Sequence, residues 1–100
     1  MILDRAHFDH MTGGDVALQA EVLGLFRAQA AGWTQTLASN DNWRDAAHTI
    51  KGSARGIGFW ALAEACAAAE SAEEQGLAAA LARVHAALAE ALRAADEAPA

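Results

Sequence analysis

Residues 43–58 read WRDAAHTIKGSARGIG, and the fold class can be inferred outward from this stretch. Its apolar residues recur at steps of three and four, which is the period of one face of an α-helix. They are Trp43, Ala47, Ile50, Ala54 and Ile57. Asn40-Asp41 can cap the start of this helix, and Gly56 and Gly58 loosen the chain at its end. The stretch therefore predicts an amphipathic helix over residues 42–56.

A second helical pattern precedes this stretch. Asp15 follows the Gly13-Gly14 break and stands in the position of an N-cap. Apolar residues then continue at helical spacing: Leu18, Val22, Phe26, Ala30, Trp33 and Leu37. We expect one long helix over residues 15–38.

Two further helical patterns follow the glycines. Phe59, Leu62, Cys66 and Ala69 predict a third helix over residues 59–75, which Gly76 ends. The clearest apolar stripe of the chain comes next, and it predicts a fourth helix over residues 77–96, closed off by Pro99. This stripe consists of Leu77, Leu81, Val84, Leu88, Leu92 and Ala95.

The predicted fold is all-α. Alanine dominates the sequence, β-branched residues are few and there is one proline, all of which favour helix over sheet. Short connections place consecutive helices side by side and antiparallel, so we expect an up-down-up-down four-helix bundle. Near the N-terminus, Phe8 and Met11 can form a short helical turn that covers one end of the bundle, assisted by Ile2 and Leu3. Residues 1–100 are expected to form a single domain.

Composition excludes several classes of function. The net charge of −6 argues against general nucleic-acid binding, which depends on Lys and Arg side chains, and favours a protein partner. No apolar run is long enough to span a membrane, and the N-terminus has no signal-peptide pattern, so we expect a cytoplasmic protein. Cys66 is the single cysteine, so no disulfide within the chain stabilises the fold.

One face of the helix over residues 42–56 is polar in an unusual way. His48 follows Ala47 of the apolar stripe and is rotated about 100° from it, which directs its side chain outward. Lys51, Gly52 and Arg55 stand three, four and seven residues further on, and so share this outer face. Glycine inside a helix costs roughly 1 kcal/mol relative to alanine. We interpret Gly52 as a gap that lets another protein approach His48.

The chemistry of this face points to phosphoryl transfer. A neutral imidazole is a nucleophile that can hold a phosphoryl group on nitrogen, so His48 is the candidate nucleophile. Lys51 can place its ammonium against the phosphoryl oxygens, and Arg55 can add positive potential. The imidazole nitrogen that does not react must be oriented, and Glu70 is the candidate for this role. With a hinge at residue 58, His48 and Glu70 lie about 15 Å and about 18 Å from it along their helices, so they can meet.

The stretch from Ala47 to Gly58, AHTIKGSARGIG, resembles the signature of histidine phosphotransfer (HPt) domains, and HxxKG is its specific part. The resemblance extends to Cys66 and Glu70 downstream and to Phe8-Asp9, Gly14-Asp15 and Phe26 upstream. It implies that Nε2 of His48 accepts a phosphoryl group from the aspartyl phosphate of a receiver domain and passes it to another. It also implies that Lys51 stabilises the phosphate, Gly52 leaves room for the receiver, Glu70 orients the imidazole and Cys66 is a packing residue.

The same resemblance implies partners and excludes a cofactor. The expected partners are response-regulator receiver domains and a hybrid sensor histidine kinase. The Mg²⁺ required for transfer is expected in the acidic pocket of the receiver, so the chain needs no metal or cofactor of its own. The sequence shows no P-loop or kinase motif, so we expect a phosphoryl carrier without autonomous kinase activity.

Other interpretations remain open. The chief alternative is a phosphorylation-incompetent helical adaptor that only docks to a kinase or receiver, although such a protein would usually have lost the histidine. An enzyme acting on a small molecule lacks a pocket motif. His7 and His10 could begin a metal site, but no second cluster completes it. The tryptophans are interpreted as packing residues, of which one could border a docking surface: Trp33, Trp43 and Trp60.

Overall fold

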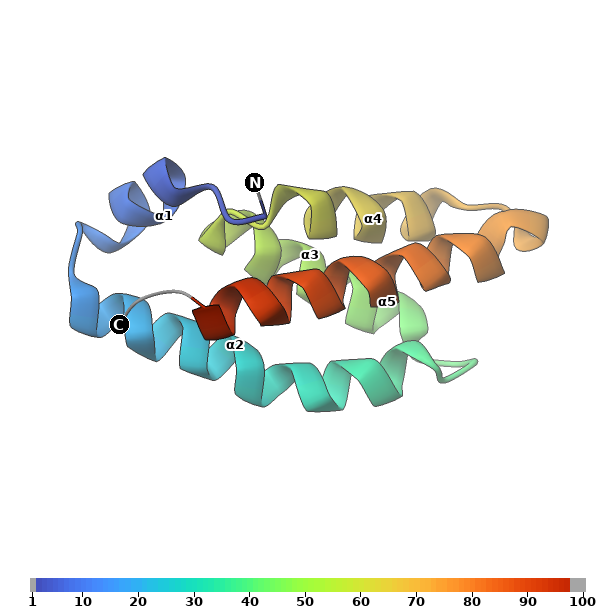
Figure 1. The fold of residues 1–100 in the computed structure, drawn as a ribbon. Coiled ribbons are helices and arrows are strands. Elements are labelled where there is room, and N and C mark those ends of the chain that lie inside the picture. Colours follow the sequence, from blue (N-terminus) through green and yellow to red (C-terminus); the bar gives the residue numbers. More distant parts are fainter. Residues whose placement is uncertain (1, 98–100) are drawn as a thin grey trace.

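The computed structural model describes residues 2–97 and shows five α-helices in this part of the chain, with no β-strand (Figure 1). The helices are α1 (Arg5–Thr12), α2 (Val16–Leu37), α3 (Trp43–Ile57), α4 (Trp60–Ser71) and α5 (Glu74–Glu97). None of the helices within the range 2–97 is long and apolar enough to cross a membrane. The all-α prediction is confirmed, with one helix more than the four long ones expected.

The four longer helices lie side by side. α4 packs between α3 and α5, and α2 contacts both α3 and α5. In Figure 1 the colour gradient shows that α2 and α4 run one way along the long axis while α3 and α5 run the other way. α1 lies at one end, where it contacts α2 and α3.

α1 is a complete helix rather than a short turn. Asp4 caps its N-terminus by accepting a hydrogen bond from the backbone N–H of His7 at 3.0 Å, and Gly13 ends it in the left-handed conformation. Phe8 and Leu3 are buried, as expected. Met11 also belongs to this end helix, but it is 57% exposed. The buried residues of α1 are Phe8 and Thr12, which stand four residues apart, and Met11 lies beside this buried face.

The core is built around aromatic rings and small residues. The ring of Phe26 lies 5.1 Å from that of Phe59 and 5.6 Å from that of Trp33, measured between centroids. Between α3 and α4 the fully buried positions are mostly small: Ala47, Ala54, Cys66 and Ala69. Small side chains allow two helices to pack at short interaxial distance. They therefore bring the outer face of α3 close to that of α4.

Helix ends differ from the sequence prediction at two places. α4 ends at Ser71, not near residue 75, because Ala72 is extended (φ −69°, ψ 140°), and α5 already begins at Glu74. Gly76 therefore lies in the first turn of α5 and, contrary to the expectation, does not end the preceding helix. α3 begins after Asn42, which makes no capping side-chain hydrogen bond, so Asn40-Asp41 is not the cap. The Asp15 cap is confirmed by a 3.0 Å hydrogen bond from the backbone N–H of Leu18. Pro99 lies outside the described residues.

The turn between α3 and α4 requires glycine. Gly58 has φ +109°, and a Cβ there would lie 3.1 Å from the carbonyl oxygen of Asp4. The backbone N–H of Asp4 donates to the Gly58 carbonyl at 3.0 Å, and the indole N–H of Trp60 donates to the Asp4 carboxylate at 2.8 Å. The indole hydrogen bond is the largest cause that lowers the pKa of Asp4. The N-terminal segment is thus attached to the hinge predicted at residue 58.

Candidate functional site

His48 lies on the outer face of α3. Its side chain is 72% exposed, whereas Ala47 before it and Ile50 after it are fully buried. The helix period accounts for this placement, because residues next to one another in sequence point about 100° apart. The imidazole is therefore accessible to another molecule.

Glu70 of α4 reaches this imidazole. Its Oε2 lies 3.2 Å from Nδ1 of His48. A carboxylate can only accept hydrogen bonds, so Nδ1 must carry the proton of the neutral ring and Nε2 must hold the lone pair. The contact thus selects the tautomer in which Nε2 has a lone pair available to act as a nucleophile.

Lys51 contacts the other oxygen of the same carboxylate. Its Nζ lies 2.7 Å from Oε1 of Glu70, and only 17% of the Lys51 side chain and 20% of the Glu70 side chain are exposed. The contact with Lys51 is the largest cause that lowers the pKa of Glu70; burial opposes it, and His48 supports it. The sequence-based expectation placed the Lys51 ammonium at the phosphoryl oxygens. In the structure it is paired with Glu70, and this pairing favours the ionised form of the carboxylate.

Gly52 and Arg55 complete the outer face of α3. Both are exposed, and a Cβ added at Gly52 would meet no atom within 4 Å. Packing within residues 2–97 therefore does not require glycine at this position, which agrees with a role in access. The backbone carbonyl of Arg55 accepts a hydrogen bond from Nε2 of His7 at 3.1 Å. The Arg55 side chain does not join the contacts around Glu70.

Arg44, which was not among the residues predicted from the sequence, also contacts Glu70. Its Nη1 donates a 2.6 Å hydrogen bond to the backbone carbonyl of Glu70, and its guanidinium lies 4.6 Å from the ring centroid of Trp43. Arg44 stands four residues before His48, so the spacing that selected Gly52 on one side of the histidine would have selected Arg44 on the other.

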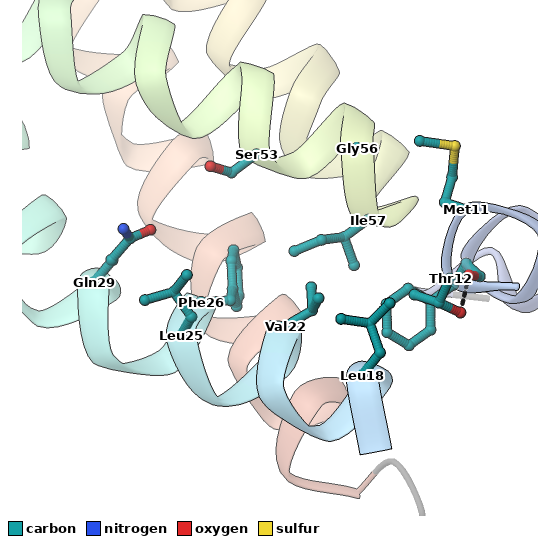
Figure 2. Close-up of a pocket in the computed structure, with 11 residues that line it drawn as sticks. Met11, Thr12, Leu18, Val22, Leu25, Phe26, Gln29, Ser53, Gly56 and Ile57 are labelled. Carbon is teal, nitrogen blue, oxygen red and sulfur yellow. Dashed lines mark hydrogen bonds between the residues drawn. The ribbon is translucent and has the colours of Figure 1, made fainter. Parts of the chain in front are cut away.

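An apolar groove of about 320 Å³ adjoins this face of α3 (Figure 2). Its α3 wall includes Ser53, Gly56 and Ile57, which follow Gly52 along the helix. The rest of the wall comes from α1 and α2: Phe8, Met11, Thr12, Leu18, Val22, Leu25, Phe26 and Gln29. Three of the large apolar side chains most exposed to solvent line it, namely Met11, Leu18 and Leu25. The groove is therefore an apolar surface beside the candidate site.

The remaining candidate residues have structural surroundings. Cys66 is fully buried, and burial is the largest cause that raises the pKa of its thiol to about 11, as fits a packing residue. The ring of His7 packs 4.8 Å from that of Trp60. Among residues 2–97 no group of three or more His, Cys, Asp or Glu side chains could hold a metal ion.

Known proteins resemble this chain in sequence and in structure. Residues 17–98 match the family model described as the Hpt domain. The fold is similar to the crystal structure of the histidine phosphotransferase ShpA from Caulobacter crescentus, with a TM-score of 0.79 and 38% sequence identity. That alignment covers 96% of this chain and 88% of ShpA. No curated protein sequence matches the chain.

Proposed function

The chain belongs to the Hpt domain family, and from this premise we propose that it relays phosphoryl groups between receiver-domain aspartates through a phosphohistidine on His48. The proposal includes a cytoplasmic location and a single Hpt domain over residues 1–100, with α2 to α5 as an antiparallel four-helix bundle. The observation that carries it is the contact between Nδ1 of His48 and the Glu70 carboxylate, on an imidazole that is otherwise exposed.

Each residue of the site has a part in the proposed reaction. Nε2 of His48 attacks the phosphorus of an aspartyl phosphate, a P–N bond forms, and the P–O bond to the aspartate carboxylate breaks. No proton has to leave the ring, because Nδ1 keeps the proton that it donates to Glu70. The ring gains a positive charge, which the Glu70 carboxylate stabilises. Attack by an aspartate of a second receiver reverses these steps.

Lys51 and Arg55 assist this reaction in the proposal. Lys51 favours the ionised form of Glu70, and its ammonium contacts the carboxylate that accepts from Nδ1 of His48, where it adds positive potential for the phosphoryl oxygens. Arg55 contributes further positive potential along the helix. The Mg²⁺ for transfer resides in the receiver, and the chain uses no cofactor of its own.

The groove and Gly52 provide the docking surface in the proposal. A receiver that delivers its aspartyl phosphate to His48 must cover the neighbouring surface of α3, where Gly52 leaves space and the groove offers exposed apolar side chains. Burial of apolar area is the main favourable contribution to most protein association. We assign this surface to receiver domains of response regulators and of a hybrid sensor histidine kinase.

The test is label transfer from a receiver domain carrying a radioactive aspartyl phosphate. Wild type should acquire an acid-labile, base-stable label, and His48→Gln should acquire none while retaining its helical circular dichroism, because an exposed side chain contributes little to packing. His10→Gln, which changes an exposed histidine of α1, is the matched control and should be labelled like wild type. ATP alone should label none of the three proteins.

Two outcomes would contradict the proposal. Label on His48→Gln would place the phosphoryl group elsewhere. Binding of several phosphorylated receivers without any label on wild type would support the alternative function, an adaptor that docks but does not carry phosphate.

A further inference from the structure

Glu70 lies in the last turn of α4, where the backbone of a helix is least well fixed by its own hydrogen bonds. It is the second-to-last residue of α4, which ends at Ser71. The last four carbonyls of an α-helix have no intrahelical N–H partner, and helix ends fray. The carboxylate that orients His48 therefore needs support from outside its own helix.

Arg44 supplies this support to the main chain. Its Nη1 donates a charge-assisted hydrogen bond to the Glu70 carbonyl at 2.6 Å. The guanidinium also lies over the ring of Trp43, and Trp43 packs against the hydrophobic core. The position of the Glu70 backbone is thus linked to the body of α3.

Three residues of α3 contact three different atoms of Glu70. Arg44 contacts the backbone carbonyl oxygen, His48 contacts Oε2 and Lys51 contacts Oε1. Their spacing of four and then three residues places them on one face of the helix. We propose that Arg44 is a positioning residue for His48, which it serves by fixing the backbone of Glu70 and hence the carboxylate at Nδ1.

This role differs from that of Lys51. Lys51 and His48 are the groups that hold the pKa of Glu70 low, whereas Arg44 contacts the main chain of this residue. Loss of Arg44 should therefore leave Glu70 ionised but less often within reach of Nδ1. The effect on transfer rests on the proposed function; the effect on the tautomer of His48 does not.

The tautomer is measured first, by ¹⁵N-edited NMR of the His48 ring in the full chain without any receiver. In wild type the proton of the neutral ring should reside mainly on Nδ1. In Arg44→Ala the Nε2-protonated form should increase, while the midpoint of thermal unfolding stays within about 4 °C of wild type because the altered contact is exposed. Arg44→Lys should restore most of the Nδ1-protonated form, since an ammonium can also donate to the carbonyl. Arg83→Ala, which removes an exposed arginine of α5, should match wild type.

Transfer kinetics then separate positioning from partner contact. Arg44→Ala should lower the maximal transfer rate from a phosphorylated receiver by about threefold to tenfold, because small losses of alignment are costly to reaction rates. The receiver concentration at half-maximal rate should change little. An unchanged tautomer in Arg44→Ala would overturn the proposal, and so would a rise in that concentration alone, which would mean that Arg44 contacts the receiver. If Arg44→Ala changed the tautomer of His48 but wild type accepted no phosphoryl group, the proposed function would fail while the positioning role of Arg44 stood.

Discussion

Nζ of Lys51 lies 2.7 Å from Oε1 of Glu70, and both side chains are about four-fifths buried. The only lysine of the chain is thus paired with the carboxylate that orients His48. A buried carboxylate without a cation tends to take up a proton, and a protonated Glu70 would accept less well from Nδ1. Lys51 is consequently linked to His48 through the Glu70 carboxylate.

Lys51→Ala should raise the pKa of Glu70. The contact with Lys51 is the main cause that depresses this pKa below its usual 4.5, and burial, which raises it, would remain. A carboxyl group with a depressed pKa loses its ionised form only as pH falls through the folded-state value, so in the variant this loss should occur at higher pH. NMR titration of the Glu70 carboxyl carbon measures the change. The pKa of Asp4, which Trp60 lowers, should be the same in both proteins. A Glu70 titration identical to wild type would contradict the role given to Lys51.

Glu70→Ala should destabilise the fold by about 1–3 kcal/mol, because it leaves the Lys51 ammonium largely buried without a partner. Lys51→Met combined with Glu70→Ala should recover most of this loss, since an apolar side chain of similar length needs no partner. Urea-induced unfolding of the two variants and wild type measures both effects. A double variant as unstable as the single one would show that the ion pair is not the cause.

The meeting of His48 and Glu70 could be predicted from the sequence because it depends on few quantities. Gly58 marks the hinge, the helical rise sets the distance of each residue from it, and the small residues between α3 and α4 bring the two faces together. Helical spacing places Arg44 on the same face as His48, but the partner of Arg44 could not be predicted in the same way. Its contact depends on α4 ending at Ser71, and the residues that follow, Ala72 and Glu73, are good helix formers that give no local stop signal.

The contact partner of Lys51 was the other feature that the sequence could not predict. The structure pairs Lys51 with Glu70 of its own chain, whereas the sequence-based expectation paired it with a phosphoryl group. Spacing along one helix cannot decide between them. Met11 is a second example, because the sequence places this apolar residue in a helical segment at one end of the bundle without showing whether a neighbour covers its side chain.

Gly52→Ala should change stability and transfer in opposite directions. The added Cβ meets no atom within 4 Å and the backbone is helical, so the free energy of unfolding should rise by roughly 0.5–1 kcal/mol. Transfer from a receiver should become slower, because the space beside His48 is partly filled. Gly32→Ala on α2 is the matched control: it lies in a helix interior with open space around it, and it should give a similar gain in stability with unchanged transfer. Equal transfer rates for the two variants would argue against the access role of Gly52.

Gly58→Ala should destabilise the fold more than Gly13→Ala. Both glycines have positive φ, which costs a residue with a side chain about 1–2 kcal/mol. At Gly58 the new Cβ would also lie 3.1 Å from the Asp4 carbonyl oxygen, whereas at Gly13 it would meet nothing within 4 Å. Urea-induced unfolding of the two variants gives the comparison. Equal losses in the free energy of unfolding for Gly58→Ala and Gly13→Ala would mean that the N-terminal segment moves aside freely and does not fix the turn at Gly58.

Leu25→Gln should weaken receiver binding without unfolding the protein. Leu25 lines the groove beside α3 and is 59% exposed, so the free chain buries less than half of it, and a receiver that covers the groove would bury the rest. Full burial of a leucine side chain contributes about 1.5–3 kcal/mol, so its partial loss should raise the dissociation constant by about three- to thirtyfold. Calorimetric titration with a receiver measures this change, and single-turnover transfer at saturating receiver should stay near the wild-type rate because the site around His48 is intact. Val16→Gln is the control, since it removes an equally exposed apolar side chain of α2 that does not line the groove. If Leu25→Gln, like the control, left the dissociation constant unchanged, the groove would not be the docking surface. The receiver would then have to reach His48 from the side of α4, across the last turn of α4, which contains Glu70.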